Sequence, residues 1–232
     1  MTPARDLAFT PAAQLARLYR ARRVSPLEVM QAVLARIDAV NPQVNAFVTL
    51  ARDAALREAR QATAGLRRGK TLPPLFGVPV GIKDVTQTKG ILTTYGSTLF
   101  KDHVPDADAL VVERLRKAGA IVLGKTNTPE FAFGPNTVNA VFGATRNPWN
   151  LARTAGGSSG GSAAALATGM CPIAEGTDLG GSLRGPASHC GVVGFRTTPG
   201  LIPRFPSVLA SDHMIRCSVW SEVTSTRSLS RA

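Results

Sequence analysis

Two residues stand in sequence surroundings that suit them for acyl-transfer chemistry. Ser182 follows two glycines in the stretch 177–184 (TDLGGSLR), where a hydroxyl can be exposed while neighbouring N–H groups point at one spot. Lys83 ends an apolar stretch that is typical of a buried strand, so we expect its amine to be desolvated. Desolvation lowers the pKa of a lysine, and the neutral amine can then act as a base. Taken singly, each feature is more often a simple turn or a lysine that reaches solvent.

A glycine-rich loop, residues 156–162 (GGSSGGS), precedes a predicted helix and contains Ser158. A loop of this kind presents free N–H groups to anions, so phosphate binding has to be considered. However, the loop lacks the Walker spacing with its Gly-Lys-Ser/Thr, and it lacks the GxGxxG fingerprint with its acidic partner. A nucleotide site is therefore disfavoured. The window 156–200 holds 12 of the 22 glycines, which indicates turns with positive φ or close backbone approach.

The elements that must position these residues form an α/β pattern. A capping box with proline at the first helical position (Ser25-Pro26-Leu27-Glu28) starts one helix, and Asn41-Pro42 is expected to end it. The sequence of strand, helix and strand after Leu75 indicates an α/β fold. The helices are expected at 7–22, 25–40, roughly 48–66, and 106–118, and the strands near 78–83 and at 120–125.

Composition limits the class of protein. With 232 residues, 44% hydrophobic and 18% charged, the chain suits one large domain or two small ones and is not a disordered protein. Three cysteines do not make a disulfide framework, and the N-terminus lacks the apolar block of a signal peptide. No stretch is apolar enough for a transmembrane helix, so we expect no membrane contact. The expected location is the cytoplasm.

The net charge of +12 raises the question of nucleic-acid binding. Residues 1–70 carry most of the excess, with 12 basic and 5 acidic side chains. These basic residues alternate with an apolar helical pattern, and aromatic residues make up only 6% of the chain. A base-stacking surface is therefore not indicated, and a solvated helix face is the favoured interpretation. No nucleic-acid partner is expected.

Together, and in this order, the motifs resemble the amidase signature family of serine hydrolases. The family includes fatty acid amide hydrolases, bacterial acylamidases and the A subunit of the tRNA-dependent amidotransferase. The resemblance covers roughly residues 8–209. It is carried by GVPVGIKD (77–84), GKTNTPEFAFG (124–134), NPWNLARTAGG (147–157) and the glycine-rich block 156–200.

The resemblance implies a Ser–Ser–Lys triad formed by Ser182, Ser158 and Lys83. Ser182 would be the nucleophile, and Ser158, which follows a cis peptide bond with Gly157 in the family's pattern, would bridge it to the lysine. Neutral Lys83 would take the proton of Ser182 through Ser158 and later return it to the leaving amine. The family relation also implies no cofactor and no metal.

Further positions acquire roles from the same resemblance. The N–H groups of Leu179, Gly180, Gly181 and Ser182 would bind the oxyanion, each donor contributing about 3 kcal/mol in the transition state. Ala132 matches a position whose backbone lies beside the bound substrate. Two more signature positions, Asp178 and Arg184, are interpreted as an ion pair of the scaffold.

A Ser-His-Asp triad is the competing enzymatic interpretation. His189 lies close to Ser182 in sequence, but the chain has no GxSxG elbow, so we expect His189 to be a packed residue. Cys171 and Cys190 are expected to be small core residues rather than nucleophiles. Metal catalysis is poorly supported because no HxxxH or CxxC pair occurs.

The resemblance implies a mixed β-sheet core flanked by α-helices, with the N-terminal helices packing on it. We expect residues 1–210 to form the N-terminal part of a single amidase domain, helical over 1–70 and α/β over 71–210. Family chains are typically much longer, so the chain is interpreted as truncated and its sheet as incomplete. The tail, 211–232, is serine- and arginine-rich like a shifted reading frame, and is expected to be aberrant and disordered.

Three functions stay open on the sequence alone. The first is an amidase that hydrolyses the C–N bond of a small-molecule amide through an acyl-enzyme, with its activity in doubt if half of the core is missing. The second is a transamidase of the A-subunit type, which would need partner subunits and a tRNA-bound substrate. The third is a non-catalytic fragment. A homodimer is compatible with the first, and the substrate itself is not readable from these residues.

Overall fold

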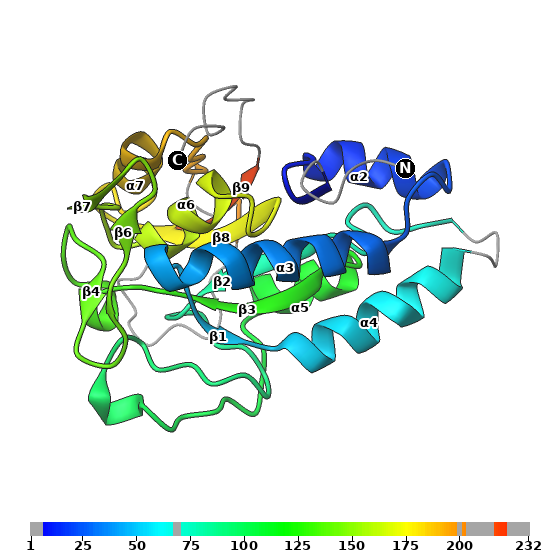
Figure 1. The fold of residues 1–232 in the computed structure, drawn as a ribbon. Coiled ribbons are helices and arrows are strands. Elements are labelled where there is room, and N and C mark those ends of the chain that lie inside the picture. The colour runs from blue at the N-terminus through cyan, green and yellow to red at the C-terminus, as the bar shows by residue number, and fades with distance from the viewer. Residues whose placement is uncertain (1–6, 67–70, 199–200, 203–215, 222–232) are drawn as a thin grey trace.

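A five-stranded sheet forms the centre of the molecule (Figure 1). The computed structural model describes residues 7–66, 71–198 and 201–202, and the backbone of 216–221. The strands lie in the order β1-β3-β2-β8-β9. Their bounds are Phe47–Leu50 for β1, Pro79–Lys83 for β2, Ile121–Thr126 for β3, Ile173–Asp178 for β8 and Arg216–Ser221 for β9.

The sheet is mixed, as the expected fold class requires. Strand β2 pairs in parallel with both β3 and β8, whereas β1 and β9 run antiparallel to their neighbours at the two edges. The three central strands are buried along their whole length. Parallel strands covered on both faces are typical of α/β proteins. Lys83 is the last residue of β2, so its side chain lies at the carboxyl end of a central, buried strand.

Helices cover this sheet, and the long helix α3 runs across it in Figure 1 with α4 beside it. The capping box at Ser25 and Glu28 is present as predicted, because the Ser25 hydroxyl accepts from the Glu28 N–H at 3.2 Å and Glu28 accepts from the Ser25 N–H at 2.8 Å. The helices are α2 (Ala12–Arg20), α3 (Pro26–Val44), α4 (Arg52–Gly65), α5 (Leu110–Lys117), α6 (Gly160–Ala167) and α7 (Arg184–Cys190).

The expected end, at Asn41-Pro42, of the helix that starts at the Ser25 capping box is wrong. Helix α3 continues through Pro42 to Val44 and ends at Asn45, which adopts the left-handed conformation. The side chain of Asn41 accepts from the N–H groups of Ala46 and Phe47 at 2.9 and 2.8 Å. This side chain supplies the turn into β1, which follows the end of the helix at Asn45 rather than the proline.

The expected helix over 48–66 is wrong in its first part. Residues Phe47–Leu50 form strand β1, which pairs antiparallel with β3, and the helix starts only at Arg52. Pairing with a strand more than seventy residues away overrides the local helical preference. The helix expected at 106–118 is present but shorter, from Leu110 to Lys117.

The tail expected to lack order contains strand β9. Residues Arg216–Ser221 pair antiparallel with all six residues of β8. The expectation of disorder therefore does not hold for these six residues, while the rest of 211–232 lies outside the described residues. Two small hairpins that the sequence did not predict precede α6. They are formed by Val138–Asn139 with Gly143–Ala144, and by Arg146–Asn147 with Asn150–Thr154.

Candidate active site

The amine of Lys83 lies between two hydroxyl groups inside the protein. Its Nζ donates to Ser158 Oγ at 2.6 Å and to Thr177 Oγ1 at 2.8 Å. The Lys83 side chain is fully buried, and Ser158 and Thr177 are buried as well. A primary amine in such contact with a serine hydroxyl can exchange a proton with it directly.

Two polar side chains of β8 contact Lys83 at the end of β2. Side chains alternate along a strand, so Glu175 and Thr177 lie on the same face of β8. Thr177 contacts the Lys83 amine, and a carboxylate oxygen of Glu175 accepts from the Lys83 backbone N–H at 3.0 Å. The lysine is therefore fixed at its backbone and at its tip by the neighbouring strand.

The loop before α6 brings Ser158 to the lysine. The Gly157–Ser158 peptide bond is cis, as the resemblance implied. The glycines that follow are explained by close packing, because an added Cβ on Gly161 would lie 2.3 Å from the backbone N of Asn127. The helix can thus lie directly against the chain after β3, which accounts for these glycines without a phosphate.

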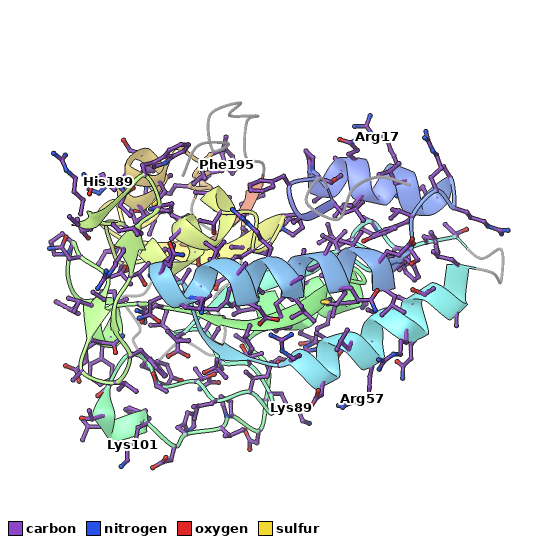
Figure 2. The ribbon with its side chains drawn as sticks, viewed as in Figure 1. Arg17, Arg57, Lys89, Lys101, His189 and Phe195 are labelled. Carbon is purple, nitrogen blue, oxygen red and sulfur yellow. The ribbon has the colours of Figure 1, made fainter. Side chains whose placement is uncertain are left out.

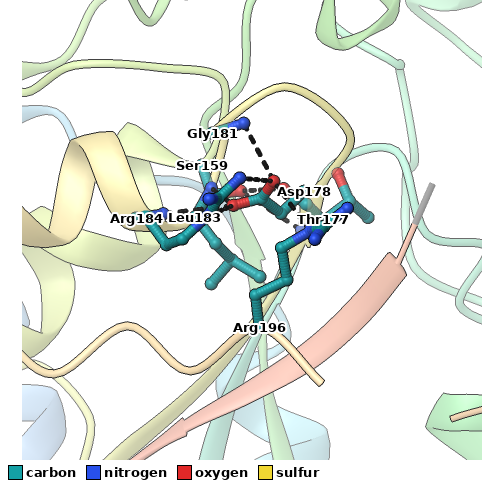
Figure 3. Close-up of polar contacts among 7 residues, drawn as sticks. All are labelled: Ser159, Thr177, Asp178, Gly181, Leu183, Arg184 and Arg196. Carbon is teal, nitrogen blue, oxygen red and sulfur yellow. Dashed lines mark hydrogen bonds and ion pairs between the residues drawn. The ribbon is translucent and has the colours of Figure 1, made fainter. Parts of the chain in front are cut away.

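Ser159 connects this loop to the segment that carries Ser182. Its N–H donates to the carbonyl of Ser182 at 3.0 Å, and its hydroxyl bonds with the backbone of Thr177 at 3.2 Å in both directions (Figure 3). Ser182 itself is half-buried. Within residues 7–66, 71–198 and 201–202, no hydrogen bond joins its hydroxyl to Ser158. The structure therefore brings Lys83 and Ser158 into contact and places Ser182 on the adjoining loop.

A buried carboxylate holds residues 179–183, which we call the Ser182 loop. Asp178 accepts from the Arg184 guanidinium at 2.9 and 3.0 Å, so the ion pair predicted for these two signature residues is present. Arg196 Nε lies 3.3 Å from Oδ1 of the same carboxylate (Figure 3). Burial raises the pKa of Asp178, but the hydrogen bonds from Arg184 and from the backbone N–H groups of Gly181, Leu183 and Arg184 outweigh it and lower the pKa to about 2.

One of the four amides expected to bind the oxyanion is engaged elsewhere. The N–H of Gly181 donates to Asp178 Oδ1 at 2.9 Å. In the described part of the chain, the N–H groups of Leu179, Gly180 and Ser182 donate no hydrogen bond to a carboxylate. Leu179 and Gly180 are exposed. Three of the four amides thus have no such partner among the described residues, and the carboxylate of Asp178 accepts from the fourth.

Ala132 lies in a strained turn two residues before Gly134, which packs against the loop that carries Ser158. Both Phe131 and Ala132 have positive φ, of 50° and 60°, and the Ala132 N–H donates to the Pro129 carbonyl at 2.9 Å. The chain then passes Gly157, where an added Cβ would lie 2.9 Å from the Gly134 carbonyl. No hydrogen bond between Ala132 and the lysine or the serines occurs among the described contacts. Residues with positive φ other than glycine are uncommon and cluster at functional sites.

The competing His189 arrangement finds little support in the geometry. His189 is exposed near the end of α7, where Figure 2 labels it at the edge of the molecule, so the expectation of a packed residue is wrong. Its carbonyl accepts from Asn147, and its side chain has no hydrogen bond to Ser182 among the described residues. Cys171 and Cys190 are buried and free, as predicted, and burial raises the pKa of both thiols to about 12.

Sequence reasoning gave no role to Thr177, Glu175 and Lys125. Lys125 is buried in β3, and its Nζ donates to the Thr86 carbonyl and, at 2.8 Å, to Thr88 Oγ1. The signal that could have found Glu175 and Lys125 is a charged residue in the interior of each of two strand-like stretches, IAEGTD and IVLGKT, with an uncharged residue on either side of it. Such charges are rarely buried without a partner.

Neither a metal site nor a membrane-spanning helix occurs among the described residues. No group of three or more His, Cys, Asp or Glu side chains there is arranged to hold a metal ion. None of the helices in that part of the chain has the length and apolar character needed to cross a bilayer.

The fold and the sequence together define the family. The model of the Amidase family matches residues 28–221, and the chain belongs to this family, the amidase signature enzymes. The match ends at residue 221, beyond residue 209 where the resemblance was expected to stop, and it includes β9. The sequence is similar to the A subunit of the glutamyl-tRNA(Gln) amidotransferase from Acidothermus cellulolyticus, with 49% identity over 209 residues. It is 46% identical over 200 residues to the corresponding protein of Carboxydothermus hydrogenoformans.

Solved structures place the fold in the same family. The structure of 6-aminohexanoate cyclic dimer hydrolase complexed with substrate aligns with a TM-score of 0.84 and 39% identity, over 92% of this chain and 44% of that one. A bacterial aryl acylamidase of the amidase signature family aligns with a TM-score of 0.86 and 32% identity, over 92% and 45%. The matches to both amidotransferase relatives cover about 90% and 86% of this chain but only 41% of the relatives' length.

Proposed function

We propose that this chain carries the proton-relay half and the nucleophile of an amide C–N hydrolase, with Ser182 as nucleophile, Ser158 as bridge and Lys83 as base. The observation that carries the proposal is the 2.6 Å contact between Lys83 Nζ and Ser158 Oγ inside the protein. A buried amine paired with a serine hydroxyl is unusual in a scaffold, because burying a charge is costly and a neutral amine is a good base.

The reaction would proceed through an ester on Ser182. Its oxygen attacks the amide carbon while its proton passes to Ser158, whose own proton passes to the neutral Lys83 amine. The tetrahedral intermediate then expels the amine, which receives the proton back through Ser158. Water attacks the ester by the same relay and releases the acid. The substrate has to draw Ser182 and Ser158 together, since hydrogen bonds of this kind often tighten only in the complex.

The oxyanion would be bound by the backbone of the Ser182 loop. The free amides of Leu179, Gly180 and Ser182 are the available donors, and Gly181 could join them only by leaving Asp178. Removal of one such donor typically costs about 3 kcal/mol of transition-state stabilisation. Ala132, in its positive-φ turn, is the proposed backbone neighbour of the substrate.

Hydrolysis of a simple aryl amide by the chain alone tests this proposal. We expect release of the aryl amine by the wild type and none above background by Ser182→Ala. A wild type that melts cooperatively but releases no amine in this assay would contradict hydrolysis by this chain. A chain without a cooperative melt would instead favour the non-catalytic fragment.

A second candidate function is favoured by the relatives at 46–49% identity, which are amidotransferase A subunits. Under this hypothesis the same three residues would release ammonia from an amide donor for transfer in a multi-subunit complex. An amide donor hydrolysed only after addition of partner subunits would favour this function, whereas aryl amide hydrolysis without partners favours the stand-alone amidase. The substrate class in either case is a small-molecule amide.

A further inference from the structure

Behind Lys83 lies a set of buried charges that the proposed relay does not use. It consists of Asp84 next to the lysine in sequence, Glu175 on β8 and Lys125 on β3, all within 1% exposure. We call these three residues the buried charge cluster. With Lys83 the set holds two amines and two carboxylates, so its formal charges can cancel. Buried charges persist only when paired and hydrogen-bonded.

Hydrogen bonds link Glu175 to Lys83 on one side and, through Thr86, to Lys125 on the other. Glu175 accepts from the Lys83 backbone N–H at 3.0 Å with one oxygen and from the Thr86 hydroxyl at 3.0 Å with the other. Lys125 donates to the carbonyl of the same Thr86. Thr86 therefore connects the carboxylate on β8 with the amine on β3.

Asp84 links the cluster to a further segment of the chain, the loop that contains Thr94. Its carboxylate accepts from the Thr94 N–H at 3.1 Å and from the Thr94 hydroxyl at 2.6 Å. Its carbonyl accepts from the N–H of Tyr95, whose own carbonyl accepts from Phe131 N–H. The loop that shapes the Phe131 turn is thus anchored to the residue that follows Lys83.

The charges in this cluster act on one another. Burial raises the pKa of Glu175, while the Lys83 N–H, the positive charges of Lys83 and Lys125, and the Thr86 hydroxyl oppose the rise. Burial lowers the pKa of Lys125 to about 8, against the attraction of Asp84, Glu175 and Asp108. Burial also raises the pKa of Asp84, against Lys125 and the bonds from Thr94 and Gly96.

We propose that Glu175 and Lys125 are positioning residues that act on Lys83 in opposite directions, Glu175 favouring its charged form and Lys125 its neutral form. The contacts on β2, β3 and β8 carry this inference, which rests on the proposed function because only a neutral Lys83 can serve as base. Lys125 thereby keeps part of the Lys83 population in the reactive form, and Glu175 holds its backbone in place. The other charged groups that bear on the pair within the described residues are Asp84 and Asp108.

Removal of one charge at a time provides the test. Glu175→Gln keeps an oxygen acceptor for the Lys83 N–H and removes only the charge. Lys125→Met removes the positive charge at similar length. Protein labelled with ¹³C at the lysine Cε carbons is titrated by NMR, and the two buried signals are assigned with Lys83→Arg and Lys125→Arg. Glu113→Gln and Lys117→Met, both on the exposed face of α5, are the matched controls.

The expected results differ in sign. In Glu175→Gln the midpoint of the Lys83 signal moves to lower pH by about one unit, and in Lys125→Met it moves to higher pH by a similar amount. The controls leave it unchanged. Midpoints that stay at the control value, or that move in the same direction in both variants, overturn the proposal, because a merely structural role predicts no opposite signs.

Two further measurements keep the test decisive. If Lys125→Met does not fold, Lys125→Gln replaces it: this variant also removes the positive charge but keeps hydrogen-bond donors for the polar groups around Lys125. The Lys83 midpoint should again move to higher pH, and no movement, or movement to lower pH, overturns the proposal. The rate at which a fluorophosphonate labels Ser182 is then followed against pH. The pH at which the labelling rate reaches half of its maximum should shift together with the NMR midpoint of Lys83. Opposite NMR shifts in a protein that is never labelled would uphold the charge coupling and reject the proposed function.

Discussion

The buried lysine side of the site and the Ser182 loop, residues 179–183, are built in different ways. Lys83 is enclosed by three central strands, and its amine has hydroxyl partners at 2.6 and 2.8 Å. The Ser182 loop begins with two exposed residues and is tied down mainly through Asp178 and Ser159. The proposed base is therefore held in place by hydrogen bonds and burial, whereas the loop is held mainly through backbone groups. The site is thus most rigidly preorganised around the lysine, the side chain whose charge matters for the proposed reaction.

The largest expected effect comes from removing the base. Lys83→Ala should lower the rate of fluorophosphonate labelling at Ser182 by at least about a hundredfold, because general-base assistance commonly contributes that much or more. Labelling is followed by mass spectrometry at equal protein concentration. Lys117→Ala, an exposed lysine on α5, should label at the wild-type rate. A Lys83→Ala protein that folds and labels normally would remove the lysine from the mechanism.

Replacing one glycine in each region should lower the free energy of unfolding by different amounts. Gly161→Ala puts a Cβ 2.3 Å from the Asn127 backbone, so we expect a loss of about 2–3 kcal/mol in the free energy of unfolding. Gly180→Ala in the Ser182 loop meets nothing within 4 Å and should change it by less than about 0.5 kcal/mol. Urea unfolding measures both variants. Equal losses would mean that the loop is as tightly packed as the buried side.

The Asp178 ion pairs should give the loop an acid-sensitive component of stability. The folded pKa of about 2 lies below the unfolded value near 3.8, so the contribution is complete above about pH 4 and is lost as pH falls through 2. Asp178→Asn should cost about 1–2 kcal/mol at pH 6, since half-exposure of Arg184 weakens the pair. Unfolding curves of the two proteins at pH 6 and pH 2.5 should differ less at the lower pH. A constant difference would contradict the assigned pKa.

The smallest effect is expected at Leu179, because the proposal uses only its backbone N–H. Its side chain is 47% exposed, so Leu179→Ala should change stability by less than about 0.5 kcal/mol and labelling of Ser182 by only a few-fold. A large loss of labelling with unchanged stability would show that this side chain, and not only its amide, contacts the ligand.

The sequence predicted the α/β class, the capping box at Ser25 and strands at 78–83 and 120–125, because each rests on a local pattern. It could not predict β1 and β9, since both depend on pairing with distant strands. The helix through Pro42 was missed because a side chain, that of Asn41, makes the following turn.

For the site, the motifs led to Lys83 and Ser158, and the structure brings these two together. What the motifs did not reveal is the use of the Gly181 amide by Asp178, which depends on the conformation of the loop. Likewise Glu175 and Lys125 become neighbours of Lys83 only through the register of β2, β3 and β8. Their roles follow from the sheet rather than from any spacing in the sequence.

The central claim, that this chain builds an activated serine, is tested most directly by a fluorophosphonate with the modified peptide located by mass. We predict a label on Ser182 that disappears in Ser182→Ala and is strongly reduced in Lys83→Ala. A wild-type protein that melts cooperatively and yet carries no label, or carries it on another serine, would contradict the account.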